Sequence, residues 1–139
     1  MYNNEEVMVM GQKLLIIDDD EDFVLITKSI LSKIEPGITI EVASSGEEGL
    51  ARLREGTVLP ALILLDVKMP GMSGIDVLRK IRDEKQLHPI PVVIVTHSII
   101  KDDLVASYKS GANSILLKTV DTDQFRRSLI NLLERFIEK

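Results

Sequence analysis

The sequence predicts an α/β fold, a doubly wound five-stranded parallel sheet with the strand order 2-1-3-4-5. Five short apolar runs recur along the chain, and most are hydrophobic throughout, which is typical of strands buried on both faces of a parallel sheet. Segments with helical spacing separate these runs. Each strand is therefore expected to pass to the next through a single helix with a right-handed crossover.

The expected strands begin after a leader at residues 1–12, and residues 13–139 are expected to form one domain. A chain of 139 residues is long enough for one core and too short for two of ordinary size. The second run alternates apolar and polar residues more than the others, which favours an edge position in the sheet. The expected strands are Lys13–Asp18, Ile38–Val42, Ala61–Asp66, Pro91–Thr96 and Ser114–Lys118.

The first two expected helices follow the first two strands. The run Ser44–Glu48 offers overlapping capping boxes, in which a serine caps the helix and a glutamate three residues on reaches back. It predicts a helix that extends to about Glu55. The helix before it is expected over Phe23–Ile34, because apolar residues there share one helical face. These residues are Phe23, Ile26, Ile30, Leu31 and Ile34.

Start and stop signals define the other three helices. Ser73 is expected to cap a helix over about residues 74–84, and Gly111 to end a helix over about residues 101–110. The last helix is expected to begin at Asp121. The core positions expected in the third and fifth helices are Ile75, Leu78, Ile81, Phe125, Leu129, Leu132, Leu133 and Phe136.

The composition limits the classes of function. The net charge of −5 and the pI of about 5.1 argue against nucleic acid as a primary partner, because phosphate binding needs a basic face. The basic run Arg79–Arg82 is interpreted as a solvated helix face. The chain has no cysteine, which excludes disulfides and thiolate metal sites. No secretion signal or stretch of membrane-spanning length is evident, so a cytoplasmic protein without a membrane partner is expected.

Polar residues at the ends of the strands mark the expected site. In an open parallel sheet the ligand binds outside the carboxyl ends of the strands, near the point where the strand order reverses. The residues at these ends are Asp18, Asp19, Asp66, Thr96 and Lys118. The acids that follow, Asp20 to Asp22, are assigned mainly to the N-terminus of the first helix, which favours negative charge.

This set of groups indicates phosphoryl transfer with a divalent cation. Carboxylates a few Å apart cannot all stay ionised without a counter-charge, and Mg²⁺ prefers oxygen ligands. A metal and a lysine neutralise charge on a phosphoryl group, a hydroxyl donates a hydrogen bond to it, and aspartate is a known nucleophile toward phosphate. The residues at the carboxyl ends of the strands therefore predict transfer of a phosphoryl group to an aspartate.

Four segments resemble the receiver domain of two-component response regulators, namely IIDDDEDF, LILLDVKMPGMSGIDVL, PVVIVT and GANSILLK. The resemblance extends from about Lys13 to the C-terminus and implies the flavodoxin-like (βα)5 fold of that family. By this resemblance Asp66 is the phospho-acceptor. The implied Mg²⁺ ligands are Asp18, Asp19, Asp66 and the backbone carbonyl of Lys68. The residues implied to contact the phosphoryl group are Thr96 and Lys118.

The same resemblance implies partners. A sensor histidine kinase donates the phosphoryl group, and the new charge reshapes the face made by the last two helices and the strand between them. An unknown downstream protein reads this face, where Leu104 and Tyr108 are candidate interface residues, and a second copy of the chain is another candidate partner. The segment DDLVASYKSGANS resembles stand-alone response regulators paired with phytochrome-type sensor kinases. Such a protein catalyses only its own phosphorylation and dephosphorylation.

Three positions depart from the family pattern. Thr119 follows Lys118 where the family usually has a proline after a cis peptide bond, so a cis and a trans bond both stay open here. Ile115 stands at the switch position, where the family often has an aromatic ring. His97 follows Thr96 where a small residue is common, and it is a candidate for gating access to the phosphate.

Two other functions stay open at this point. A haloacid-dehalogenase-like phosphatase also uses an Asp-x-Asp pair at a strand end with Mg²⁺, and Asp18 and Asp20 supply such a pair. The chain is short for the core and cap usual in that class. A receiver-like scaffold that no longer switches is the other alternative, and Thr119 and Ile115 are the residues that support it.

Overall fold

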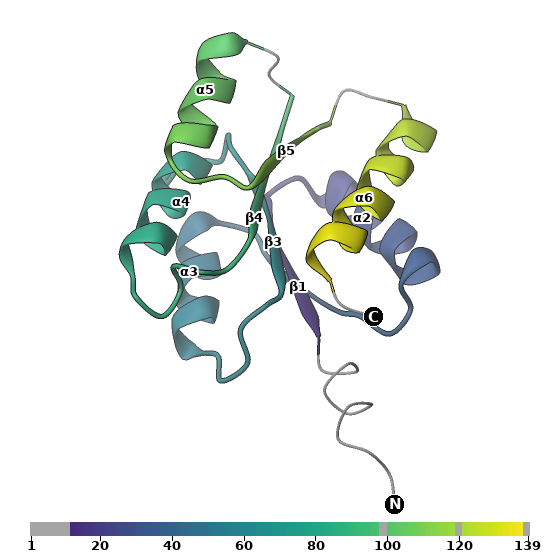
Figure 1. Cartoon of the computed structure of the whole chain (residues 1–139), viewed down its shortest axis with the longest axis horizontal. Coiled ribbons are helices and arrows are strands. Elements are labelled where there is room, and N and C mark those ends of the chain that lie inside the picture. The colour runs from purple at the N-terminus through teal and green to yellow at the C-terminus, as the bar shows by residue number, and fades with distance from the viewer. Residues whose placement is uncertain (1–11, 98–99, 119–120, 138–139) are drawn as a thin grey trace, which may run out of the picture.

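The computed structural model describes residues 12–97, 100–118 and 121–137, and this part of the chain has the predicted architecture. Five parallel strands form one sheet with the order β2-β1-β3-β4-β5 (Figure 1). The strands are β1 (Lys13–Ile17), β2 (Thr39–Ala43), β3 (Leu62–Asp66), β4 (Val92–Thr96) and β5 (Ser114–Leu117). The helices that follow them are α2 (Glu21–Ile34), α3 (Gly46–Glu55), α4 (Gly74–Asp83), α5 (Lys101–Lys109) and α6 (Thr122–Phe136).

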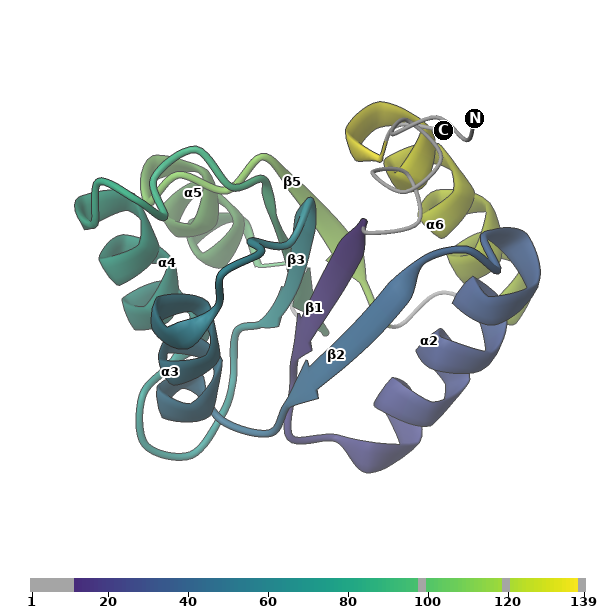
Figure 2. The same cartoon turned by 90° about the horizontal axis from the view of Figure 1, so that it is seen from below.

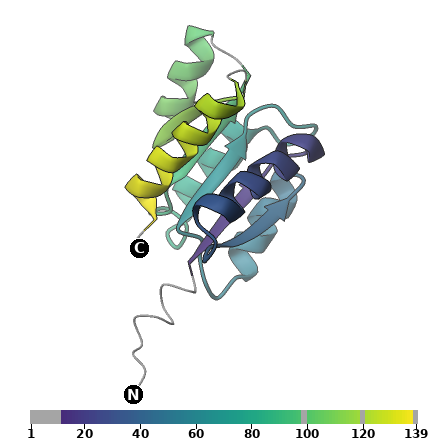
Figure 3. The same cartoon turned by 90° about the vertical axis from the view of Figure 1, so that its right-hand side faces the viewer.

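The helices cover both faces of the sheet. Helices α3, α4 and α5 lie on one face, and α2 and α6 lie side by side on the other (Figures 2 and 3). Because alternate residues of a strand point to opposite faces, Leu15 and Ile17 join the core under α3 and α4, whereas Leu14 and Ile16 join the core under α2 and α6. Burial on both faces is the reason that the strand sequences are continuously apolar.

The predicted edge strand is confirmed. β2 pairs with β1 alone, and of its residues only Ala43 is fully buried. The alternating sequence of β2 reflects this one-sided environment, since an edge strand has less of its surface covered by neighbours.

Side-chain caps begin four of the helices, and three of them, those of α3, α4 and α6, were predicted. The hydroxyl of Ser45 accepts the N–H of Glu48 at 3.1 Å, and the Glu48 carboxylate reaches back to the N–H of Ser44 at 3.0 Å. The return contact of this capping box therefore involves the residue before the cap. The other capping residues are Asp20 for α2, Ser73 for α4 and Asp121 for α6.

The expectation that Ile26 faces the core is wrong. Its side chain is 52% exposed, while the neighbouring Thr27 is completely buried. Position 27 lies one helical turn from both Phe23 and Leu31, so these three residues share the face that α2 turns toward the sheet. Apolar character alone suggested position 26, but the helical phase set by the buried Leu31 selects position 27.

The interpretation of Arg79–Arg82 as a solvated face is wrong for Arg82. Its guanidinium donates to the carbonyls of Gly111 (3.0 Å), His88 (2.9 Å) and Ile90 (2.8 Å) and to Oδ1 of Asn113 (2.8 Å). Burial lowers the pKa of Arg82 from its ordinary value. Arg82 thereby joins the end of α4 to the segments that lead into β4 and β5. Gly111 ends α5 as predicted, with a φ of 107° that suits glycine.

Candidate active site

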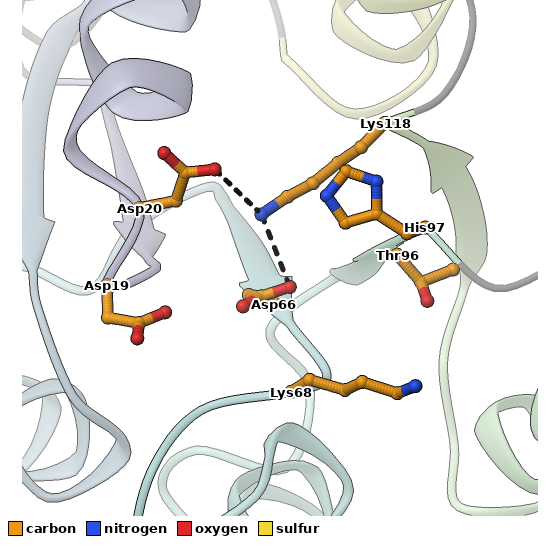
Figure 4. A pocket seen from close by; sticks show the side chains of 7 residues that line it. All are labelled: Asp19, Asp20, Asp66, Lys68, Thr96, His97 and Lys118. Atoms are coloured by element: carbon orange, nitrogen blue, oxygen red, sulfur yellow. Dashed lines mark ion pairs between the residues drawn. The ribbon is translucent and has the colours of Figure 1, made fainter.

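The carboxyl ends of β3, β4 and β5 and the start of α2 enclose a small pocket (Figure 4). Its volume is about 160 Å³. The residues that line it are Asp19, Asp20, Asp66, Lys68, Thr96, His97 and Lys118. Asp18 lies buried beside this pocket and contacts Lys118. The fold therefore brings together the five strand-end residues that the sequence predicted.

The strand ladder holds the site residues at the ends of the strands. The backbone N–H of Asp18 donates to the Ala43 carbonyl at 3.0 Å, and that of Lys118 donates to the Thr96 carbonyl at 2.9 Å. Thr96 is itself the last residue of β4 and is buried. These bonds continue the parallel sheet by one residue and limit the backbone freedom of the groups that carry the chemistry.

The loop after β3 folds back tightly against Asp66. The N–H of Gly74 donates to the carbonyl of Val67 at 2.8 Å, and a Cβ at position 74 would overlap the carbonyl oxygen of Asp66. Only glycine permits this approach. The sequence predicts Gly74 only as the start of a helix, and its role in placing Asp66 becomes visible in the structure. The glycine directly after the capping Ser73 was the available signal.

Three carboxylates form a compact acidic cluster. Asp18, Asp19 and Asp66 each offer an oxygen within 4.8 Å of the others. Asp18 is 2% exposed and Asp66 is 6% exposed, whereas Asp19 faces solvent. Burial, reinforced by the Asp18 charge and opposed by Lys118, raises the pKa of Asp66 to about 6. Burial also raises the pKa of Asp18, against the hydrogen bond from the Asp20 N–H and the contact with Lys118.

Lys118 is the cation of this cluster. Its Nζ lies 2.9 Å from Oδ2 of Asp18, 3.4 Å from Oδ1 of Asp66 and 4.0 Å from Oδ2 of Asp20 (Figure 4 draws the last two). The side chain is 4% exposed. Burial alone would lower the pKa of Lys118, but the contacts with Asp18 and Asp66 outweigh it and raise the pKa.

The donor set fits a divalent cation. One ammonium group cannot balance three clustered carboxylates, and two of these are taken out of water. The oxygens available are the kind that Mg²⁺ prefers, and the open pocket beside them leaves space for water or phosphoryl oxygens. Asp18, Asp19 and Asp66 are therefore suited to hold Mg²⁺. Lys68 lines the same pocket, and the role of its backbone carbonyl as a ligand stays a prediction.

The other predicted positions are placed differently. His97 is exposed, and its ring lies between the side chains of Lys118 and Thr96 at the pocket (Figure 4). Ile115 packs against the core on the α3 and α4 face and does not line the pocket. The absence of an aromatic ring at position 115 therefore concerns the expected switching movement and does not change which residues line the pocket. The Lys118–Thr119 peptide bond lies outside the described residues.

The candidate interface residues lie on α5. Leu104 is partly buried, and Tyr108, one helical turn further on, is 55% exposed. The two residues therefore share one side of the helix, and neither lines the pocket. Exposed aromatic residues are enriched at protein interfaces, so this side of α5 stays a candidate contact surface.

Phe23 is a site neighbour that the sequence analysis missed. Its ring centroid lies 4.4 Å from Nζ of Lys118. The contact itself joins two residues far apart in the chain, so no local pattern could reveal it.

The phosphatase alternative is not favoured. Oδ1 of Asp20, the second carboxylate of the Asp-x-Asp pair, accepts the N–H of Phe23 at 3.1 Å and caps α2, so one of its two oxygens is committed to the helix. Asp20 thus serves the helix N-terminus, as the sequence predicted for this part of the acidic run.

A family model described as response regulator receiver domain matches residues 14–130 of the 139-residue chain. The chain belongs to this family. Receiver domains are signalling domains of two-component systems, and phosphoryl acceptance and Mg²⁺ binding are general properties of the family. The acidic cluster of this receiver domain, at Asp18, Asp19 and Asp66, is of the kind that serves both.

Curated relatives agree with this assignment. The receiver domain is 39% identical over 107 residues to the transcriptional regulatory protein AfsQ1 of Streptomyces coelicolor, covering 77% of this chain and 44% of AfsQ1. The chain thus spans less than half of that relative's length. It is 28% identical over 131 residues to the chemotaxis protein CheY-3 of Vibrio cholerae, covering 94% of this chain and 98% of CheY-3.

A solved structure shares the whole fold. The phosphorylated cyanobacterial phytochrome response regulator RcpA superposes with a TM-score of 0.84 at 26% identity, covering 91% of this chain and 94% of RcpA. Among the described residues of this receiver domain, no helix is both long and apolar enough to cross a membrane.

Proposed function

We propose that this receiver domain accepts a phosphoryl group on Asp66 from a sensor histidine kinase. The observation that carries the proposal is the pairing of Lys118 with both Asp18 and Asp66, at 2.9 and 3.4 Å, beside a pocket of about 160 Å³. This arrangement leaves a carboxylate oxygen next to a buried cation and an open space of a size suited to a small anionic group. Both features support attack by this carboxylate on phosphorus.

The proposed reaction exchanges one bond to phosphorus for another. An oxygen of Asp66 forms a bond to phosphorus, the phosphorus–nitrogen bond of the donor phosphohistidine breaks, and the imidazole leaves with the electron pair and takes up a proton. Lys118 neutralises negative charge on the phosphoryl oxygens, and the Thr96 hydroxyl donates a hydrogen bond to one of them. Mg²⁺ held by Asp18, Asp19 and Asp66 would supply further charge neutralisation.

The signal is proposed to leave through a protein surface. A phosphoryl group on Asp66 adds negative charge beside Thr96, the last residue of β4, and Lys118, which directly follows β5. The face made by α5, β5 and α6, with Leu104 and Tyr108 on α5, is the surface proposed to change and to bind an unidentified downstream protein. The similarity to RcpA supports testing phytochrome-type sensor kinases first as donors. A complex with a second copy of the chain stays a prediction.

The first test is labelling by a small phosphodonor. Wild-type protein incubated with acetyl phosphate and Mg²⁺ should gain one hydroxylamine-sensitive phosphoryl group, detected by intact mass. Asp66→Asn should gain none, and Asp22→Asn, which changes an exposed acid of the same run, should label like wild type. Full labelling of Asp66→Asn would reject Asp66 as the acceptor.

The metal requirement is tested with the same assay. EDTA should abolish labelling of the wild type, and Asp18→Asn should need a higher Mg²⁺ concentration for half-maximal labelling. Turnover of p-nitrophenyl phosphate that is lost in Asp18→Asn but kept in Asp66→Asn would instead indicate the phosphatase. Phosphotransfer from purified sensor kinases of the same genome then identifies the donor.

A further inference from the structure

The Lys118 ammonium group lies against an aromatic ring as well as against carboxylates. Its Nζ is 4.4 Å from the centroid of the Phe23 ring, while Asp18 and Asp66 contact it at 2.9 and 3.4 Å. The face of an aromatic ring carries partial negative charge and attracts a cation at this distance, more strongly where water is excluded. The Lys118 side chain is 4% exposed, so the contact lies in such an environment.

The ring of Phe23 is held independently of Lys118. Phe23 lies in the first turn of α2, where its N–H is bound by the Asp20 carboxylate at 3.1 Å. Its ring meets the buried Phe125 of α6 edge to face, with centroids 5.4 Å apart and an interplanar angle of 65°. Two helices therefore fix the ring before any ligand arrives, and it can serve as a wall for a flexible side chain.

Lys118 needs a rigid neighbour of this kind because its stem is flexible and because Asp18 and Asp66 compete for its ammonium group. A lysine ammonium rotates freely on four methylene groups, and the nearer partner is Asp18 and not the proposed acceptor Asp66. A third contact on the α2 side restricts the ammonium group to positions from which it reaches both carboxylates.

We propose that Phe23 is a positioning residue, whose ring holds the Lys118 ammonium group toward Asp66 for phosphoryl transfer. The inference rests on the proposed function of Asp66 and Lys118. Phe23 does not touch the reacting atoms, and it acts through Lys118. Any residue that keeps an aromatic face at position 23 should preserve the effect, whereas an aliphatic residue of similar size should not.

The test compares rates of labelling by acetyl phosphate at saturating Mg²⁺. Phe23→Leu keeps an apolar side chain but loses the ring, and its labelling rate constant should fall by about three- to tenfold, the factor expected for a partly desolvated cation–π contact. Phe23→Tyr should restore most of the rate. Phe136→Leu, which removes the ring of another partly buried phenylalanine from the same core, should label like wild type. Equal rates for Phe23→Leu and wild type would overturn the proposal.

A double-substitution cycle separates positioning from general packing. In a Lys118→Met background, Phe23→Leu should cause no further loss of rate, since the ammonium group on which the ring acts is gone. The same fold loss in both backgrounds would show that the ring acts through packing and would overturn the proposal.

The chemical shift of the Lys118 ε-methylene protons tests the contact with Phe23 without phosphorylation. The Lys118 ε-methylene protons should resonate upfield in wild-type and Phe23→Tyr protein and move downfield in Phe23→Leu. Failure of wild-type Asp66 to label would reject the proposed function and leave this shift unaffected. An unchanged Lys118 resonance in Phe23→Leu, in a protein that does label, would reject the ring contact alone.

Discussion

Asp66, the proposed acceptor, is a carboxylate held in a buried position at the end of β3, and burial opposes its ionisation. The charge of Asp18 nearby adds to the cost of ionising it, and Lys118 offsets only part of this cost. In the metal-free protein the site is therefore electrostatically strained at neutral pH, because its negative charges exceed its fixed positive charge. A divalent cation relieves this strain, so metal binding and the ionisation of Asp66 favour each other.

This strain predicts how stability depends on pH. The pKa of Asp66 is raised to about 6, above its usual value of 3.8, so between about pH 4 and pH 6 the folded protein retains a proton that the unfolded chain has released. The free energy of unfolding should therefore fall as pH rises through this window. Asp66→Asn lacks the titrating group, so in EDTA its stability relative to wild type should rise by about 2–3 kcal/mol between pH 4 and pH 8.

Urea unfolding of both proteins at a series of pH values measures this difference, because contributions of carboxyl groups that do not interact with Asp66 cancel in the comparison. Saturating Mg²⁺ at pH 8 should reduce the advantage of Asp66→Asn by stabilising the wild type. A difference that does not vary with pH would contradict the assignment of a raised pKa to Asp66.

Single residues also show what the sequence could and could not predict. Asp18, Asp66, Thr96 and Lys118 were predicted together because each ends a strand, and parallel strands end at one edge of the sheet. The contact of Phe23 with Lys118 was not predictable, since it depends on how α2 is rotated against the sheet. The partners of Arg82 were missed for a similar reason, because carbonyls of distant loops carry no sequence signal.

At the scale of elements, the start of α4 is the most tightly constrained joint near the site. Gly74→Ala should destabilise the protein by about 1–3 kcal/mol or more, since the new methyl group would overlap the Asp66 carbonyl and lie 2.8 Å from Cα of Val67. The backbone of Asp66 must move to accommodate it, so labelling by acetyl phosphate should slow as well.

The chain offers a matched control for this substitution. A Cβ at Gly37 would meet nothing within 4 Å, so Gly37→Ala should change the free energy of unfolding by less than about 0.5 kcal/mol. Urea unfolding of the two variants checks the stability, and intact mass checks the labelling. Equal stabilities for Gly74→Ala and Gly37→Ala would show that the loop after β3 can relax freely.

Element boundaries followed from local signals, whereas helix orientation did not. The caps at Ser45, Ser73 and Asp121 were predicted because a capping side chain bonds its own helix a few residues on. The buried face of α2 was misjudged at Ile26, because the packing partner and not the residue type decides which of two adjacent positions is covered. Thr27 is buried in its place, although threonine carries a hydroxyl.

At the scale of the whole molecule, the helices are held to the sheet unequally. Within the described part of α5, Ser107 is the one fully buried residue, and its hydroxyl bonds the Asp103 carbonyl of the same helix at 3.0 Å. Ile100 at its start has no polar side-chain atom with which to cap the helix. By contrast, α4 buries Val77, Leu78 and Ile81 in addition to its first residue. Local opening is easiest where burial is least, so α5 is expected to open more readily than α4.

The position of α5 connects this weakness to the site. The helix lies between β4 and β5 in the chain, and Thr96, which ends β4, and Lys118, which directly follows β5, line the pocket. A new negative charge at Asp66 that attracts the side chains of Thr96 and Lys118 acts on both strands that flank α5. A weakly held helix in this place can respond by a shift in population without a large change elsewhere in the fold. Ile115 packs against the core and has no aromatic ring that could move together with such a change.

Hydrogen exchange of backbone amides should therefore locate the response in α5. In EDTA the amides of α5 should exchange faster than those of α4, and Mg²⁺ with beryllofluoride, an analogue of the aspartyl phosphate, should alter exchange in α5 and in β5 more than in α4. In Asp66→Asn the same addition should leave exchange unchanged, because the acceptor oxygen is missing. Protection of α5 equal to that of α4 would contradict the inference from burial. Binding of beryllofluoride without any change in exchange would instead favour a receiver-like scaffold that no longer switches.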